Sequence, residues 1–177
     1  MKDVFRILRG ICRVIHTFRQ TKSKRRLAAK IKPSEKIFDI DRYLVSESFP
    51  ELAKKMTIPN RYARNLVNLE EKLLLPIESQ WGRMEVLSGY RSKELNDAVG
   101  GSKTSDHLIG AAADITTPEV DLETLFEWII QEGLPFRQVI FYPQQQFIHI
   151  SINTLKNKFK IQALLKTENG YEEVKLP

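Results

Sequence analysis

Two histidines and one aspartate place a strong demand on the fold of this chain. His107 and Asp114 stand seven positions apart in Ser105-Asp-His-Leu-Ile-Gly-Ala-Ala-Ala-Asp114, and His149 follows much later in Phe-Ile-His-Ile-Ser. Two neutral imidazoles and one carboxylate suit tetrahedral Zn²⁺ and leave the fourth position open for a water molecule. If these residues bind zinc, the fold must bring distant segments to one point.

The segment around His149 has the alternation of a strand whose two faces differ. His149 shares one face with Phe147 and Ser151, whereas Ile148 and Ile150 lie on the other. If the isoleucines face the core, His149 faces a cleft.

Asp114 lies near the end of a small-residue strand expected over residues 111–115, so one sheet could present Asp114 and His149 together. His107 would then arrive from a glycine-rich loop. The spacing alone leaves open a structural role in place of zinc binding. A lone histidine or aspartate often stabilises a turn or makes a hydrogen-bonded contact in the core.

The rest of the sequence predicts an α+β fold. Pro76 is expected to kink or end the second helix early, and Thr117-Pro118 is expected to cap the fourth. Helical periodicity and strand alternation predict helices over residues 41–49, 59–80, 92–99 and 117–133, strands over residues 84–87, 111–115, 138–142 and 147–152, and a hairpin over residues 158–175 that turns at Asn169-Gly170.

Size and composition indicate one globular domain behind a basic arm. The chain has 177 residues, 42% of them hydrophobic, which is enough for a sizeable core. Its one cysteine, Cys12, cannot form an intramolecular disulfide. No apolar run is long enough to span a membrane, and the N-terminus lacks the features of a secretory signal. We therefore expect a protein that stays in the cytoplasm until release, or one that is associated with a virion.

Residues 1–32 differ sharply in charge from the body, residues 33–177. The arm holds eleven Lys or Arg and one acid, a net charge of +10, whereas the remainder holds 17 basic and 21 acidic residues, a net charge of −4. Apolar residues at helical spacing predict an amphipathic basic helix of about 18 residues. The candidate residues for binding an anionic surface are Arg6, Arg9, Arg13, Arg19, Arg25 and Arg26.

Several partners fit such an arm. It could bind an anionic membrane, nucleic acid or the groove of a partner protein, including other virion proteins. Alternatively, its apolar stripe packs on its own domain.

The central motif also resembles that of a known protein family. The stretch Ser88-Gly-Tyr-Arg-Ser-Lys-Glu-Leu-Asn-Asp-Ala-Val-Gly-Gly-Ser-Lys-Thr-Ser-Asp-His-Leu-Ile-Gly-Ala-Ala-Ala-Asp114-Ile closely resembles the zinc D-alanyl-D-alanine carboxypeptidase family, peptidase family M15. The resemblance is to the branch common in bacteriophage genomes, and it covers roughly residues 38–153. It implies the hedgehog/DD-peptidase fold, an α+β unit with a small antiparallel central sheet flanked by helices.

The resemblance also implies roles for individual residues. Zinc would be bound by His107, Asp114 and His149. Arg91 matches an arginine that the family uses near substrate, and Ser105 matches a small polar position that shapes the same loop and contacts substrate. The alternative for Arg91 is a salt bridge that holds the loop.

Zinc-assisted peptide hydrolysis also needs a carboxylate near the zinc-bound water to take its proton. This chain does not match the family at the positions of that carboxylate. Family members place it three residues before the last histidine or in the preceding strand region, where this chain has Gln146 and Phe141-Tyr142-Pro143. Gln146 could orient a water but cannot accept its proton, and Tyr142 is a poor base because its ordinary pKa is about 10. Asp106 is the nearest acid, with a loop cap or a solvated charge as its alternative role.

Two functions follow from these observations. The first is a zinc-dependent peptidase that cuts peptidoglycan stem peptides, as a D-alanyl-D-alanine carboxypeptidase or a cell-wall endopeptidase associated with a phage. The second is a catalytically impaired, peptidase-like virion or assembly protein whose basic arm binds nucleic acid, membrane or a partner.

Overall fold

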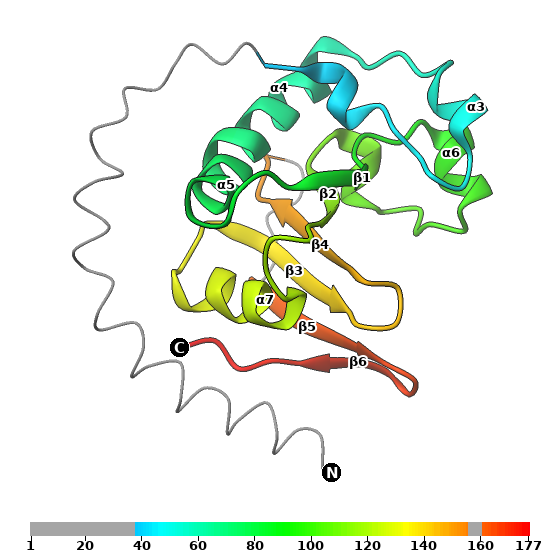
Figure 1. Cartoon of the computed structure of the whole chain (residues 1–177). Coiled ribbons are helices and arrows are strands. Elements are labelled where there is room, and N and C mark those ends of the chain that lie inside the picture. Colours follow the sequence, from blue (N-terminus) through cyan, green and yellow to red (C-terminus); the bar gives the residue numbers. More distant parts are fainter. Residues whose placement is uncertain (1–37, 156–160) are drawn as a thin grey trace. The chain divides into compact units, whose positions relative to one another are not determined.

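A computed structural model describes residues 38–155 and 161–177 (Figure 1). The described part forms one compact unit, Phe38–Pro177. The basic arm, residues 1–32, lies outside the described residues, together with its expected amphipathic helix and its six candidate arginines. Within the described residues, no helix combines the length and the apolar character needed to cross a bilayer.

A six-stranded sheet forms the centre of the unit, and its strands are ordered β1-β2-β4-β3-β5-β6 (Figure 1). The strands expected from the sequence are all present, and the C-terminal hairpin turns at Glu168-Asn169, one position before the expected Asn169-Gly170. Their bounds are β1 (Glu85–Ser88), β2 (Ala112–Thr116), β3 (Phe136–Tyr142), β4 (Phe147–Ile152), β5 (Gln162–Thr167) and β6 (Gly170–Glu173).

The expectation of an antiparallel sheet is wrong for one pair of strands. All neighbours are antiparallel except β3 and β5, which are parallel. The reason is topological: β2 and β3 already occupy both edges of β4. The chain leaving β4 therefore crosses to the free edge of β3, and the sheet is mixed.

Helices flank this sheet, so the predicted α+β class is confirmed. Their bounds are α3 (Pro50–Ala53), α4 (Asn60–Leu69), α5 (Leu75–Trp81), α6 (Lys93–Ala98) and α7 (Leu122–Gln131), with 3₁₀ turns η1 (Ile40–Tyr43) and η3 (Asp106–Ile109) and a π-helical segment η2 (Glu70–Leu74). Pro76 does not end the long second helix. It stands in the first turn of α5, where a missing N–H is tolerated.

Two helix predictions need correction. The helix expected over residues 41–49 is absent, because Ser46 forms an isolated β-bridge with Ser88, and Pro50 favours the start of a helix over its interior. The cap of α7 is Asp121, whose carboxylate accepts the Thr124 N–H at 3.0 Å. Thr117 instead accepts the Glu119 N–H and holds the turn before the helix.

The core lies on one face of the sheet. Ile148 and Ile150 are fully buried there, in one cluster with residues of α4, α5 and α7. Trp81 of α5 meets Trp128 of α7 edge-on, with ring centroids 6.0 Å apart. The alternation along β4 therefore turns His149 toward the opposite face, as the sequence predicts.

Candidate metal centre

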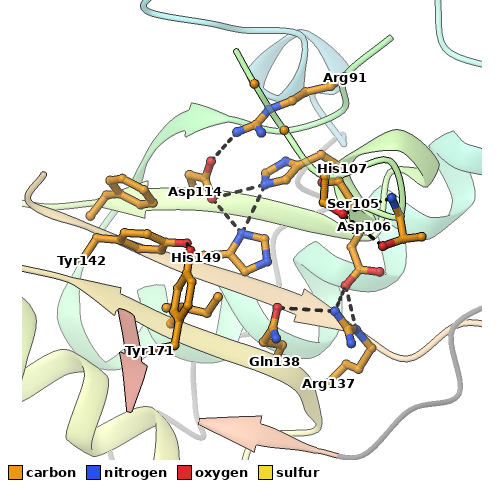
Figure 2. A pocket seen from close by; sticks show the side chains of 16 residues that line it. Arg91, Ser105, Asp106, His107, Asp114, Arg137, Gln138, Tyr142, His149 and Tyr171 are labelled. Atoms are coloured by element: carbon orange, nitrogen blue, oxygen red, sulfur yellow. Dashed lines mark hydrogen bonds and ion pairs between the residues drawn. The ribbon is translucent and has the colours of Figure 1, made fainter. Parts of the chain in front are cut away.

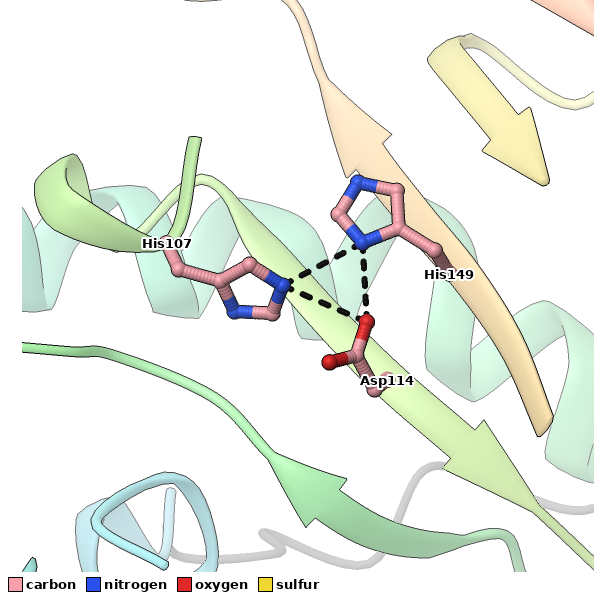
Figure 3. A group of neighbouring side chains, drawn as sticks. All are labelled: His107, Asp114 and His149. Atoms are coloured by element: carbon pink, nitrogen blue, oxygen red, sulfur yellow. Dashed lines mark hydrogen bonds and ion pairs between the residues drawn. The ribbon is translucent and has the colours of Figure 1, made fainter. Parts of the chain in front are cut away.

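His107, Asp114 and His149 meet on the face of the sheet that the core leaves free (Figure 3). His149 Nδ1 lies 2.8 Å from Asp114 Oδ1, and His107 Nε2 lies 3.2 Å from the same oxygen. The two nitrogens are 3.2 Å apart. These atoms are close enough to hold one metal ion.

The pairing of β2 with β4 places two of the three side chains. Asp114 lies directly opposite His149 in this antiparallel pair, so both point to the same side. Ser88 of β1 and Ile140 of β3 continue the same row on either side. One sheet thus presents the carboxylate and one imidazole, as the sequence predicts.

His107 arrives from η3, and Gly110 makes this approach possible. Gly110 ends η3 with φ +65°, a left-handed conformation that glycine adopts readily. A Cβ at this position would lie 2.6 Å from the Tyr62 carbonyl oxygen. Gly110 therefore lets the chain turn tightly against α4 and enter β2 with His107 and Asp114 facing each other.

A backbone hydrogen bond fixes the tautomer of His107. Its Nδ1 lies 2.6 Å from the carbonyl oxygen of Gly89, and since a carbonyl can only accept, Nδ1 carries the proton. The lone pair of Nε2 then faces Asp114 and His149. Histidines that bind metals are commonly oriented in this way.

The charges around the centre favour a neutral His107 and an ionised Asp114. Burial lowers the pKa of His107, in spite of the opposing effect of Asp114. Burial alone would raise the pKa of Asp114, but when His107 or His149 is protonated, its positive charge and hydrogen bond lower that pKa well below its ordinary value. These are the protonation states that zinc binding requires.

Arg91 holds the second oxygen of Asp114. Its Nη2 donates to Asp114 Oδ2 at 2.6 Å, and its Nε donates to Ser88 Oγ at 2.9 Å. These contacts orient the carboxylate so that Oδ1 faces the two imidazoles. Because Arg91 also lines the adjacent pocket, the salt bridge leaves a contact with substrate possible.

The three donors fit a zinc ion. In tetrahedral zinc, bonds of about 2.0–2.1 Å separate the ligand atoms by about 3.3 Å, so a small outward shift from 2.8–3.2 Å admits the ion. The lone pair of His107 Nε2 otherwise faces a carboxylate oxygen, which repels it. A cation between them turns this repulsion into two attractions.

The cluster opens into a cavity of about 610 Å³ (Figure 2). Glycines and hydroxyl residues between Gly100 and Ser105 line one part of it. Tyr142, Phe147 and Tyr171 line another. A bound peptide can therefore extend from the metal ligands toward either a polar loop or an aromatic wall.

The structure separates the remaining candidates. Ser105 lines the pocket just before η3. Gln146 is exposed in the β3–β4 turn, where its side-chain amide donates to the Pro143 carbonyl, and it is not among the residues that line the pocket. Asp106 is buried, and Arg137 Nε donates to its Oδ2 at 2.6 Å, so Asp106 is not a solvated charge.

The sequence analysis assigned no role to several pocket residues, among them Arg137, Gln138 and Tyr171. Arg137 and Gln138 come from β3, and Tyr171 comes from β6. Gln138 offered a partial signal, because it is a polar residue at the start of the apolar run Val139-Ile140-Phe141 in the strand expected over residues 138–142. Arg137 and Tyr171 have no comparable local signal, since their roles depend on long-range contacts.

Comparison with known proteins agrees with this geometry. The family model described as Peptidase M15 matches residues 51–151, more than half of the chain and a span that includes all three clustered residues. No curated protein matches the chain. M15 peptidases are typically zinc-dependent, and the three donors here fit that metal. From the matched span and the His-Asp-His cluster within it, we conclude that the chain belongs to the peptidase M15 family.

Proposed function

We propose that this protein is a zinc-dependent peptidase of the bacterial cell wall. It would cut peptidoglycan stem peptides as a D-alanyl-D-alanine carboxypeptidase or an endopeptidase, on a hedgehog/DD-peptidase fold and in association with a bacteriophage. The family supports metallopeptidase chemistry in general. The observation that carries the proposal is the His107 Nδ1–H bond to Gly89, which turns the Nε2 lone pair toward His149 and Asp114.

Each residue of the centre has a defined task in this proposal. His107 Nε2, Asp114 Oδ1 and His149 Nδ1 would hold the ion, and Arg91 would keep Asp114 in its orientation. When bound, zinc would acidify a water molecule and polarise the carbonyl of the peptide bond. The guanidinium of Arg91 adds positive charge at the same edge of the pocket, where an anionic intermediate would form.

A second function is favoured by the state of the two acids in the pocket. Hydrolysis needs a group that takes a proton from the attacking water. Among the described residues that line the pocket, the acids are Asp106, which is bound by Arg137, and Asp114, which is bound by Arg91. This pairing supports a catalytically impaired protein that binds wall peptides without cutting them, as part of a virion or an assembly.

The basic arm enters this proposal as a binding segment. Residues 1–32 would bind an anionic membrane, nucleic acid or a virion protein through their net charge of +10. A chain lacking residues 1–32 should cleave small soluble muropeptides as the full chain does. It should also lose a salt-sensitive interaction with anionic vesicles or nucleic acid.

Mass spectrometry of muropeptides separates the two functions. The zinc-loaded full chain is incubated with muropeptides beside His149→Ala, whose zinc content is measured in parallel. Cleavage by the wild type that is lost in the variant supports the peptidase and identifies the bond. No cleavage by a protein that holds stoichiometric zinc contradicts the peptidase and supports the impaired binding protein.

A further inference from the structure

Two tyrosines from distant strands meet in the pocket wall beside the metal centre (Figure 2). Tyr142 is at the end of β3, and Tyr171 is in β6 of the C-terminal hairpin. Their hydroxyl oxygens are 3.3 Å apart, and both residues line the same cavity as His107, Asp114 and His149. Tyr171 lies outside residues 51–151, so the family match does not account for it.

The sheet register places Tyr142 next to the metal ligands. On β3, Ile140 pairs with His149, and Tyr142 pairs with Phe147. Tyr142 therefore lies one step further along the same face of the sheet, at the usual two-residue spacing of about 6.5–7 Å. The charges of Asp114 and Arg91 both act on its hydroxyl, which agrees with this proximity.

Packing holds the Tyr142 ring in place. Phe147 stacks on it with centroids 4.4 Å apart and an angle of 17° between the ring planes, and Tyr171 meets it edge-on at 6.3 Å. Tyr171 is itself held by Lys166, whose Nζ lies 4.6 Å from its ring centroid. The hydroxyl of Tyr142 is thus fixed in the wall before any substrate arrives.

The hydroxyl of Tyr142 is suited to donate a hydrogen bond to a bound substrate. Burial raises the pKa of Tyr142 well above its ordinary value, so its hydroxyl keeps its proton and cannot serve as the missing base. Two hydroxyls share one hydrogen bond, so one of their two protons stays available. If Tyr171 donates to Tyr142, the proton of Tyr142 faces the pocket.

We infer that Tyr142 donates a hydrogen bond to the carbonyl oxygen of the peptide bond that is cut, and that Tyr171 is the residue that positions it. This inference rests on the proposed peptidase function. A fixed donor aimed at an oxygen that gains negative charge in the transition state increases the rate without tightening substrate binding. Tyr142 is then a catalytic residue that contacts substrate, and the β5–β6 hairpin completes the pocket.

Tyr142→Phe removes the donor and keeps the stacked ring. The change should lower kcat by about 100-fold or more, with little change in KM, because the bond forms mainly in the transition state. Tyr171→Phe should lower kcat by less, since Tyr142 loses only its partner. Tyr62→Phe is the matched control, because Tyr62 does not line the pocket, and it should hydrolyse as the wild type does.

A tetrahedral phosphinate analogue of D-Ala-D-Ala gives the second measurement. Tyr142→Phe should weaken inhibition by the analogue about as much as it lowers kcat/KM, while binding of the D-alanine product and of zinc stays unchanged. A merely structural role would lower the melting temperature and weaken all three ligands together. Should Tyr142→Phe lose stability, the more exposed Tyr171→Phe supplies the same comparison.

Different results would overturn the proposed peptidase function and the inference about Tyr142. A wild-type protein that holds zinc and cleaves nothing overturns the proposed function, and the inference falls with it. A wild type that cleaves muropeptides while Tyr142→Phe keeps its kcat and its phosphinate inhibition overturns the inference alone.

Discussion

The two faces of the central sheet differ in what they contribute. On one face, Ile148 and Ile150 are fully buried in the core cluster. On the other face, His149 from the same strand lies beside Asp114 and borders a cavity. One strand thus supplies stability and chemistry at alternating positions, so substitutions at neighbouring residues should separate the two.

His149→Ala should have the largest effect, on the polar face. It removes one of the three proposed metal donors, and we expect loss of stoichiometric zinc and of muropeptide cleavage. Folding should survive because the side chain belongs to the cavity wall and not to the core. Metal analysis, cleavage and the melting temperature are measured together. Full zinc occupancy in the variant would show that the metal is bound elsewhere.

Ile148→Ala, one residue away, is the matching change on the apolar face. It should lower the free energy of unfolding by about 2–5 kcal/mol because it leaves a cavity in the core. Below the melting temperature, the variant should still bind one zinc. Denaturant unfolding followed by circular dichroism measures the loss. A variant with wild-type stability but no zinc would contradict the division between the faces.

Arg91→Gln tests how the polar face is held together. Loss of the ion pair to Asp114 Oδ2 should weaken zinc binding by about 10–100-fold, as removal of a group that orients a metal ligand commonly does. A chelator competition titration gives the affinity. If zinc affinity is unchanged while KM rises, Arg91 acts on substrate and not on the ligand.

Asp106→Asn concerns the second ion pair of the pocket. The change leaves the mostly buried Arg137 without its anion, so the free energy of unfolding should fall by about 1–3 kcal/mol. Arg137→Gln should produce a similar loss if the pair is structural. A variant Asp106→Asn that is fully stable and binds zinc but cleaves nothing would instead assign Asp106 to proton transfer.

Lowering the pH should reduce the free energy of unfolding of the zinc-free protein, by a smaller amount than these substitutions do, through the titration of groups on the polar face. Burial lowers the pKa of His107 in the folded chain, whereas in the unfolded chain this residue takes up a proton at about pH 6.5. The unfolded state is therefore favoured as the pH falls below that value. Stability should therefore fall below pH 6.5, by at most about 1.4 kcal/mol for each pH unit from this residue. The lowered pKa of Asp114 acts in the same direction at lower pH.

The melting temperature of the zinc-free protein between pH 7.5 and 5 measures this effect, and His107→Gln is the control. The pH dependence in this window should be shallower in the variant. Equal slopes for the wild type and the variant would contradict a buried, neutral His107.

Local patterns predict the centre of this molecule well. Alternation around His149 fixes which face it takes, and the small-residue strand that ends near Asp114 packs beside β4 as expected. The long helix with its regular apolar spacing is also found, because a repeating pattern over many residues determines such an element. The fold class and the placement of Asp114 beside His149 therefore follow from short stretches of sequence.

Features that depend on distant partners could not be predicted in the same way. The parallel pairing of β5 with β3 follows from which strand edges are already occupied, and the irregular path before Pro50 depends on the bridge from Ser46 to Ser88. Arg137 meets Asp106 across 31 positions, and Tyr171 meets Tyr142 across 29. No local periodicity encodes contacts of this kind.

X-ray absorption at the zinc edge of the metal-loaded full chain tests the central claim most directly. The account predicts one zinc with two imidazoles and only nitrogen or oxygen donors, at about 2.0–2.1 Å. His149→Ala should lose this spectrum. A sulfur donor, for which Cys12 is the only cysteine, or an unchanged spectrum in the variant would contradict the assignment of His107, Asp114 and His149 as the metal centre.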